Sequence, residues 1–263
     1  MAGYTTAELM ACVMARALAD GEVAVMGAVS QIPVLACRLA QETHAPNLEF
    51  IVGGSGAVSP LGPLVPSSCD FRQLEARAAL PLPDVILLEG RGDRLDVFFA
   101  GGLQIDRYGN CNLVCVGEWA APRLRGPGTV GLPFLPRAGR TIIYTTAHTP
   151  RTFVEKVDFN SGPGFLDGPA SWTAAGVPGK GPALVVTPLG VMDFHPESKL
   201  MRLRSLHPGV TLEQVQQNTG FGLLLPEGLP GSEAGVPVTP EPAAEELAIL
   251  RRLDPEGIAR HLV

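Results

Sequence analysis

Short apolar segments alternate with amphipathic ones along the first half of the chain, and this alternation constrains the fold more than any other feature. Residues 22–28 predict a buried strand, residues 33–43 a helix and residues 48–52 a second strand, which together make a βαβ unit. Because strands joined by helices run parallel and are covered on both faces, the sequence predicts an open α/β fold with a largely parallel sheet and helices on both faces. The same rhythm predicts one further helix and three further strands, at 83–89, 96–100, 141–144 and 153–157.

Two helix starts carry side chains that suit helix capping. Thr5 followed by Glu8 fits a capping box, and we expect the helix that it opens to run to about Asp20. Thr211 followed by Gln214 fits a second capping box. In such a pair each side chain accepts a hydrogen bond from a backbone N–H that the helix leaves free, so both helices are expected to begin at these positions.

The last third of the chain is expected to add strands and then helices. A linker-like loop, rich in Gly, Pro and Glu, spans residues 226–242, and two short helices are expected after it. No repeat or change of composition marks a boundary, so residues 1–263 are expected to form a single α/β domain. The strands are expected at 183–187, 190–194 and 201–206.

Charge and hydropathy exclude two classes of partner. The chain carries 20 Lys and Arg against 26 Asp and Glu, and no basic cluster that would attract a nucleic acid. The longest uncharged stretch, residues 50–69, holds four Gly and three Pro and is not expected to span a membrane. The N-terminal residues lack the basic and apolar segments of a secretory signal, so we expect a cytoplasmic enzyme.

The cysteines favour neither a disulfide framework nor a metal centre. Their number, five, is odd, and no C-x-x-C pair occurs. Reduced, mostly buried thiols are therefore expected, and no metal site is predicted.

A glycine-rich stretch, residues 52–60, follows the second predicted strand. Gly53, Gly54, Ser55 and Gly56 remove nearly all side-chain bulk there, so backbone amides would be free to approach a phosphate, a carboxylate or an oxyanion. Open α/β sheets bind ligands at the carboxyl ends of their strands, which is where this stretch lies. The spacing matches neither a dinucleotide-binding fingerprint nor a P-loop, and a plain turn explains it equally well.

A second polar stretch, residues 101–112, follows the strand predicted at 96–100. Gln104, Asn110 and Asn112 each carry an amide that both donates and accepts hydrogen bonds, so they suit a carboxylate or a pantetheine amide. The alternative is that residues 108–110 form a simple hairpin turn. Residues 151–158 by themselves indicate an ordinary edge strand, and no Ser, His and Asp ordering stands out.

Together these stretches resemble the β subunit of glutaconate CoA-transferase and its relatives in the class I CoA-transferase family, over nearly the whole chain. Their combination and order are more specific than any one motif. The matching motifs are Gly101-Gly102 with Gln104 and Asp106, Gly109-Asn110 with Asn112, residues 153–159 leading to 161–164, residues 189–194, Met201-Arg202, residues 205–210 and residues 219–221.

The resemblance implies a class I CoA-transferase β-subunit-like fold and an α-type partner subunit in a heterodimer or higher heteromer. It also implies an acyl-CoA substrate at the subunit interface, with coenzyme A present as part of the substrate and no bound cofactor. The family has a second glycine-rich loop at this place, and Val130, Leu132 and Pro133 depart from the residues expected in it. The positions implied to contact the substrate or its CoA are Gly53, Gly102, Gln104, Asn110, Asn112, Gly128 and Gly131.

The family's nucleophile is a glutamate that attacks the thioester from the first glycine-rich loop, and the matching triplet here is Gly54-Ser55-Gly56. A hydrogen atom cannot replace a carboxylate nucleophile. The nearest acids along the chain, Glu49 and Asp70, lie outside the loop. Two diverged branches of the family, a decarboxylase and a steroid ring-cleaving hydrolase, also lack that glutamate. The resemblance therefore implies a diverged acyl-CoA hydrolase, lyase or decarboxylase.

Two alternatives remain open from the sequence. One is a genuine CoA-transferase, of the 3-oxoacid or glutaconate type, whose nucleophile lies elsewhere. The other is a non-catalytic CoA-binding partner that completes the interface while the α subunit carries out the chemistry.

Overall fold

The computed structural model describes residues 3–226 and 235–263, and the chain divides into two compact units. Unit 1 comprises Met1–Phe99 and Glu241–Val263, and unit 2 comprises Ala100–Pro240. Residues 227–234 of the predicted linker-like loop lie outside the described residues. The expectation of a single domain stays a prediction, and each unit is described by itself.

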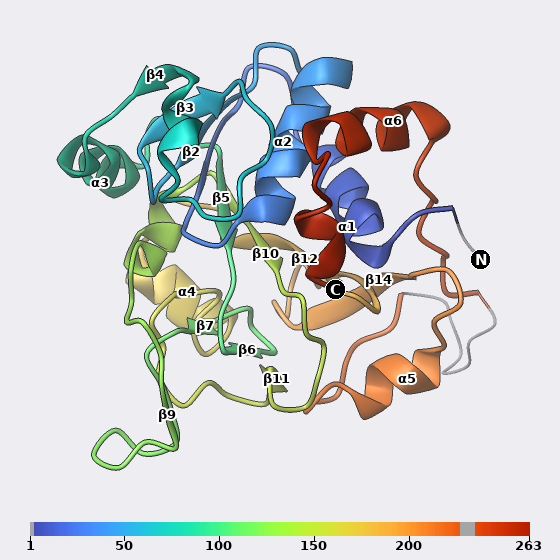
Figure 1. The fold of residues 1–263 in the computed structure, drawn as a ribbon. Coiled ribbons are helices and arrows are strands. Elements are labelled where there is room, and N and C mark those ends of the chain that lie inside the picture. The colour runs from blue at the N-terminus through green and yellow to red at the C-terminus, as the bar shows by residue number, and fades with distance from the viewer. Residues whose placement is uncertain (1–2, 227–234) are drawn as a thin grey trace. The chain divides into compact units, whose positions relative to one another are not determined.

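The helices of unit 1 form one packed group. α1 packs against α2, and α6 contacts both (Figure 1). Their contact buries the side chains of Met10, Met14 and Leu39 completely, which removes a large apolar area from water. The helices are α1 (Thr6–Ala15), α2 (Gln31–Thr43), α3 (Leu82–Arg91) and α6 (Ala244–Leu253), with the 3-10 turns η1 (Phe71–Leu74) and η3 (Ala259–His261).

The capping box predicted at the start of α1 is confirmed. The backbone N–H of Thr5 donates to Glu8 Oε2 (2.7 Å), and the N–H of Glu8 donates to Thr5 Oγ1 (3.3 Å). Such a cap stabilises a helix by about 1 kcal/mol. α1 ends at Ala15, earlier than the expected Asp20, because the chain turns through Gly21 (φ 77°) to enter the first strand.

The sheet of unit 1 is parallel in its first part and antiparallel towards β4. β5, β1 and β2 run parallel, and β3 and β4 follow as antiparallel neighbours. The three parallel strands are buried almost throughout, as their continuous apolar sequences predict. The strands are β1 (Val23–Met26), β2 (Glu49–Val52), β3 (Ala57–Pro60), β4 (Ala76–Ala79) and β5 (Val97–Ala100).

Unit 2 contains a second set of paired strands. β10 and β12 are parallel, and β13 and β14 extend them as an antiparallel pair. β6 pairs with β7 as a hairpin and with β11 in parallel, while β8 and β9 form a separate hairpin. The strands are β6 (Gln104–Asp106), β7 (Cys111–Asn112), β8 (Cys115–Val116), β9 (Leu124–Arg125), β10 (Arg140–Tyr144), β11 (Phe153–Val154), β12 (Pro182–Val186), β13 (Gly190–Phe194) and β14 (Met201–Leu206).

The short helices of unit 2 are α4 (Pro169–Ala175), α5 (Leu212–Gln217) and the 3-10 turn η2 (Leu132–Arg137). The capping box predicted for α5 is confirmed, since Gln214 N–H donates to Thr211 Oγ1 (3.1 Å) and Thr211 N–H donates to Gln214 Oε1 (2.8 Å). The turn at residues 108–110 is a hairpin turn, as one of the two interpretations of that stretch predicted.

The predicted α/β fold class is confirmed. In unit 1 the strands β5, β1 and β2 are parallel, in unit 2 the strands β10 and β12 are parallel, and antiparallel strands follow them in both units. No helix in the described part of the chain is both long enough and apolar enough to cross a membrane.

Candidate functional site

The glycine-rich stretch forms a tight turn between β2 and β3. The N–H of Gly53 donates to Met26 O (2.8 Å), which ties the end of β2 to the end of its parallel neighbour β1. The N–H groups of Ser55 and Gly56 both donate to Val52 O, at 3.1 and 2.8 Å. The predicted loop therefore lies at the carboxyl ends of two parallel strands, where open α/β sheets bind ligands.

Only glycine fits position 56. Gly56 has a φ of 72°, in the left-handed region that other residues rarely adopt. A Cβ atom added there would lie 1.9 Å from Leu80 O, the carbonyl that follows β4. Gly56 is thus required by the turn itself.

Position 54 differs, because its glycine faces solvent and a neighbouring side chain. Gly54 is exposed, and within the described residues its N–H has no hydrogen-bond partner. A Cβ atom at position 54 would lie 2.5 Å from Ser68 Oγ and 3.0 Å from Ser68 Cβ. A side chain at this position would have to displace Ser68, so the loop presents a free amide donor and no carboxylate.

Polar and apolar side chains together line a small hollow beside the turn. Ser55 Oγ donates to Oε1 of the buried Gln73 (3.0 Å). Gln31 Nε2 donates to Pro66 O (2.7 Å), while the buried Gln31 Oε1 has no partner among the described residues. The residues that line the hollow are Ser30, Gln31, Val34, Val52, Leu64, Ser68 and Gln73.

The two acids nearest to the loop in sequence are occupied elsewhere. Glu49 accepts from Arg77 Nη1 (2.6 Å) and from Ser59 Oγ (2.7 Å). Asp70 caps η1 and pairs with Arg72, whose hydrogen bond is the main cause that lowers the pKa of the Asp70 carboxyl to about 2. Neither carboxylate is available to replace a nucleophile on the loop.

A third acid, which sequence reasoning missed, reaches the loop from α3. Glu89 is 5% exposed, and its Oε1 lies 3.9 Å from the position that a Cβ atom on Gly53 would occupy. Its Oε2 is buried and has no hydrogen-bond partner in the described residues. Burial alone raises the pKa of the Glu89 carboxyl to about 7. No sequence pattern singles out Glu89, because the burial of its carboxyl depends on how α3 packs in the fold.

In unit 2 the amides of Gln104 and Asn112 bind each other. Asn112 Nδ2 donates to Gln104 Oε1 (2.7 Å) and to Cys115 O (2.6 Å). Gln104 Nε2 donates to Asp158 Oδ2 (3.0 Å), and Asn112 Oδ1 accepts from Val114 N (2.9 Å). Both side chains are buried, and their polar atoms are used within the hairpin and its neighbours.

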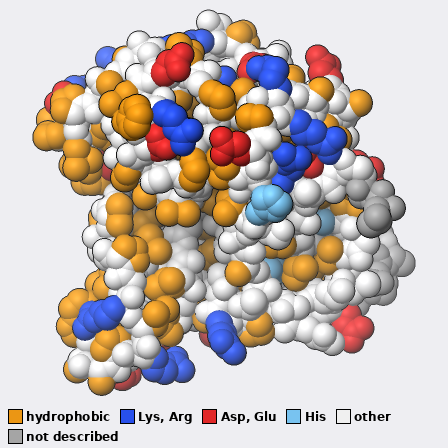
Figure 2. All heavy atoms as spheres, in the orientation of Figure 1, with side chains coloured by type: hydrophobic (Ala, Val, Ile, Leu, Met, Phe, Trp, Pro, Cys, Tyr) orange, Lys and Arg blue, Asp and Glu red, His pale blue; other side chains and the backbone are white. Residues whose placement is uncertain are grey.

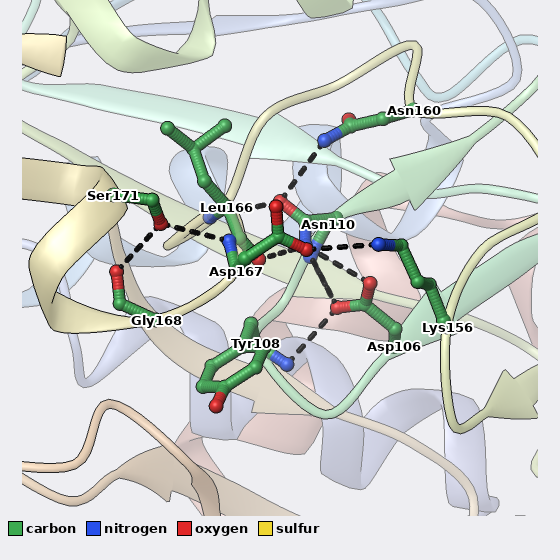
Figure 3. A network of polar contacts seen from close by, with 9 residues as sticks. All are labelled: Asp106, Tyr108, Asn110, Lys156, Asn160, Leu166, Asp167, Gly168 and Ser171. Atoms are coloured by element: carbon green, nitrogen blue, oxygen red, sulfur yellow. Dashed lines mark hydrogen bonds and ion pairs between the residues drawn. The ribbon is translucent and has the colours of Figure 1, made fainter.

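Asn110 occupies the centre of a separate network (Figure 3). Its Nδ2 donates to both carboxylate oxygens of Asp106 (3.1 and 2.9 Å) and to Leu166 O (2.8 Å). Its Oδ1 accepts from Gly164 N (2.8 Å), Leu166 N (3.1 Å) and Asn160 Nδ2 (3.2 Å). Burial raises the pKa of Asp106 in spite of these hydrogen bonds. Asn110 therefore joins the β6–β7 hairpin to the segment before α4.

The structure thus brings Gln104 and Asn112 together and places Asn110 in its own network. All three amides support the fold of unit 2 through bonds to the chain itself. That they also contact the substrate stays a prediction.

The three other predicted glycines of unit 2 differ in their surroundings. A Cβ atom on Gly102 would lie 2.8 Å from Gln104 O and 2.9 Å from Asn112 O, so close packing of the hairpin requires glycine there. Gly128 has a φ of 108° and open space around its Cβ position, and Gly131 precedes η2. Within residues 3–226 and 235–263 no three His, Cys, Asp or Glu side chains are placed to hold a metal ion.

Comparison with known sequences gives one family and several full-length relatives. The family profile described as Coenzyme A transferase matches residues 86–218. The chain is 33% identical to the B subunit of 3-oxoadipate CoA-transferase from Pseudomonas knackmussii, over 99% of this chain and 97% of that protein. It is also 33% identical to the cholesterol ring-cleaving hydrolase IpdB subunit of Rhodococcus jostii, over 88% of this chain and 85% of that protein.

Solved structures give the same result. Glutaconate coenzyme A-transferase from Acidaminococcus fermentans superposes with a TM-score of 0.83 at 30% identity, covering 97% of this chain and 96% of that chain. The decarboxylase AibA/AibB superposes with a TM-score of 0.82 at 27% identity, covering 98% of both chains.

Proposed function

The chain belongs to the coenzyme A transferase family, as its motifs predicted, and on that premise we propose that it is the β subunit of a diverged acyl-CoA hydrolase, lyase or decarboxylase. Its relatives of matching length are single subunits of two-part enzymes, among them the B subunit of a CoA-transferase, IpdB and a chain of AibA/AibB. An α-type subunit is accordingly the expected partner, and an acyl-CoA thioester the expected substrate.

The loop at Gly54 carries this proposal. CoA transfer in this family needs a glutamate there, and Ser68 Oγ lies 2.5 Å from the position where the Cβ atom of any side chain would stand. The segment from Phe50 to Cys69 contains no acid at all. Without a carboxylate to accept the acyl group, the two-step covalent transfer has no first step.

The loop retains one group that is useful to thioester chemistry. The unpartnered N–H of Gly54 suits an oxygen that gains negative charge in the transition state, and one such donor contributes roughly 3 kcal/mol. Polarising the thioester in this way favours loss of carbon dioxide or cleavage of a carbon–carbon bond β to the carbonyl, as well as hydrolysis. Relatives named as a hydrolase and a decarboxylase support these reactions.

The second candidate is a genuine CoA-transferase with a displaced nucleophile. Its support is the 33% identity to the B subunit of 3-oxoadipate CoA-transferase over nearly the whole chain. The two candidates differ in the products formed, which are carbon dioxide, a cleaved acid or free CoA in the first and a thioester of the added acceptor acid in the second.

The test uses the purified complex of this chain with its α-type subunit. The probes are glutaconyl-CoA and 3-oxoadipyl-CoA, each with isotopically labelled acetate present as an acceptor, because cleavage of 3-oxoadipyl-CoA itself yields unlabelled acetyl-CoA. We expect free CoA, carbon dioxide or a cleaved acid, with little labelled acetyl-CoA. Rapid formation of labelled acetyl-CoA would refute the proposal in favour of the second candidate.

A matched double variant sharpens this test. Gly54→Glu combined with Ser68→Gly restores a carboxylate and the space for it. We expect this variant to gain a glutamyl-CoA adduct and acetyl-CoA formation, while Ser68→Gly alone gains neither.

A further inference from the structure

Helix α3 departs from the usual pattern of an amphipathic helix, in which apolar side chains are buried and charged ones are exposed. It buries Glu89, whereas Leu82 and Leu87 on the same helix are 61% and 65% exposed. Exposed apolar side chains gather over this end of unit 1 in Figure 2, where α3 and β4 lie in Figure 1. Exposing a leucine and burying a carboxyl each destabilise the folded state. Departures of this kind from the usual burial pattern concentrate at functional sites.

The surroundings of Glu89 contain nothing that compensates its burial. No hydrogen-bond partner of Oε2 exists in the described part of the chain, and no ion pair involves the carboxyl. Among the described residues, no charged side chain contributes to its titration, and burial is the sole cause of its shift. An unpartnered buried polar group destabilises a fold, so a structural role does not explain this carboxyl.

The direction in which Glu89 points supplies an explanation. Its Oε1 lies 3.9 Å from the Cβ position of Gly53, one residue before the exposed Gly54 with its free N–H. A proton-carrying side chain and an oxyanion donor therefore reach the same turn, from two segments that lie more than thirty residues apart in the sequence.

We propose that Glu89 is the acid–base residue of this loop, which donates a proton to the carbon next to the thioester and removes one from it in the reverse direction. The inference rests on the proposed function and adds the residue that moves the proton.

The step balances with groups on this chain and water. The departing carbon leaves as carbon dioxide or, where it is a keto carbon, as a carboxylic acid after water has added to it. As its bond to the carbon next to the thioester breaks, the electron pair stays on the acyl chain and is delocalised onto the thioester oxygen, to which Gly54 N–H donates. The Glu89 O–H then gives its proton to the carbon, and the resulting carboxylate regains a proton from water. No oxidant, reductant or metal takes part.

Its titration suits this role. A carboxyl with a pKa of about 7 is present in both protonation states near neutral pH. Proton transfer is most effective when the pKa of the catalytic group lies near the working pH. An ordinary glutamate would be almost wholly ionised there and a poor donor.

The experiment follows proton exchange directly. The αβ complex is incubated in D2O with glutaryl-CoA, and deuterium at the carbon next to the thioester is measured by mass spectrometry. We expect Glu89→Gln to slow incorporation by at least roughly 100-fold, the usual contribution of an acid–base residue. Asp84→Asn, which changes an exposed carboxylate on the same helix, is the matched control and should exchange like the wild type.

The pH profile of the wild type gives a second readout that does not depend on a variant. The exchange rate should rise with pH and level off, with a midpoint near 7, and Glu89→Gln should lack this transition. A merely structural glutamate would leave the profile unchanged. Equal exchange in Glu89→Gln and wild type, or no exchange in the wild type, would overturn the inference.

The outcome for Glu89 is separable from that for the proposed function. If the complex releases carbon dioxide or free CoA and Glu89→Gln exchanges normally, the function stands and the assignment of Glu89 fails. If the wild type instead transfers CoA to acetate through an adduct on Glu89, both fail, and Glu89 is the displaced nucleophile.

Discussion

In the sequence, the amide network of unit 2 and the glycine-rich turn of unit 1 are both candidate substrate sites. In the structure they differ in whether their polar atoms have hydrogen-bond partners. Around Asn110, each polar atom of the amide has at least one partner in the chain. Around Gly54, the backbone N–H, Gln31 Oε1 and Glu89 Oε2 have none within the described residues.

This difference distinguishes polar groups that stabilise the fold from polar groups that are free to bind a ligand. A buried polar group with all its partners stabilises one conformation, and binding a ligand would require it to break bonds. An unpartnered group loses nothing when a ligand arrives and gains a partner. The unpartnered atoms therefore support our proposal that the turn of unit 1 is the reactive site, while the amides of unit 2 hold their own fold.

The largest effect is expected in unit 2, from Asn110→Ala. The change leaves the N–H groups of Gly164 and Leu166 without their acceptor and removes the side-chain nitrogen that donates to both carboxylate oxygens of the buried Asp106. Each buried group left without a partner costs roughly 1–3 kcal/mol, so we expect a loss of about 4 kcal/mol in urea unfolding. Asn160→Ala, which removes one bond from an exposed residue, is the control. Equal losses in both variants would contradict the assignment of Asn110.

The next effect is a pH dependence of stability in unit 1. The folded chain holds a proton on Glu89 up to about pH 7, whereas the unfolded chain loses it near the ordinary value of 4.5. The stability contributed by the neutral carboxyl is therefore complete below about pH 4.5 and is lost as the pH rises to about 7. The loss is on the order of 3 kcal/mol.

Glu89→Gln should remove this dependence. Thermal unfolding between pH 4.5 and 8 should show the variant melting several degrees above the wild type at pH 8 and close to it at pH 4.5. Asp84→Asn should follow the wild-type curve. A Glu89→Gln variant that is less stable than the wild type at pH 8 would indicate an ion pair or hydrogen bond that stabilises the carboxylate.

A smaller effect is expected from Gly54→Ala. The added methyl group would lie 2.5 Å from Ser68 Oγ, so the serine must move, and we expect a loss of roughly 1–3 kcal/mol. Ser68→Gly in the same chain should recover most of that stability in denaturant unfolding. If the single variant is as stable as the wild type, Ser68 does not fill the space at position 54.

The smallest effect on stability is expected when a glutamine in each region is changed to leucine. Gln31→Leu removes one hydrogen bond and one unpartnered acceptor, so its stability should stay within about 1 kcal/mol of the wild type. Gln104→Leu removes bonds to Asn112 and Asp158 and should cost more. Similar unfolding midpoints for the two variants would remove the distinction between the two regions.

Local patterns predicted much of the fold. The capping pairs at Thr5 and Thr211, the βαβ unit at 22–52 and the helix at 83–89 all depend on residues close in sequence, and all are confirmed. The antiparallel strands β3 and β4 were missed. β3 lies in a segment interpreted as a loop because of its glycines and Pro60, and pairing with β2 outweighs that local tendency.

The candidate site was predicted only in part. The glycine turn was visible because its residues are consecutive. Glu89 was not, because its importance depends on the proximity of α3 to Gly53, which no spacing rule encodes. The amides at 104, 110 and 112 show the converse, since residue type alone cannot tell a satisfied amide from a free one.

Trapping of a covalent intermediate shows directly whether this chain supplies a nucleophile for CoA transfer. The αβ complex is incubated with glutaconyl-CoA, treated with borohydride or hydroxylamine, and this chain is analysed by mass spectrometry. We expect no modified glutamate in the wild type and a modified residue 54 in the Gly54→Glu, Ser68→Gly variant. A trapped glutamyl-CoA on any glutamate of the wild-type chain would contradict it.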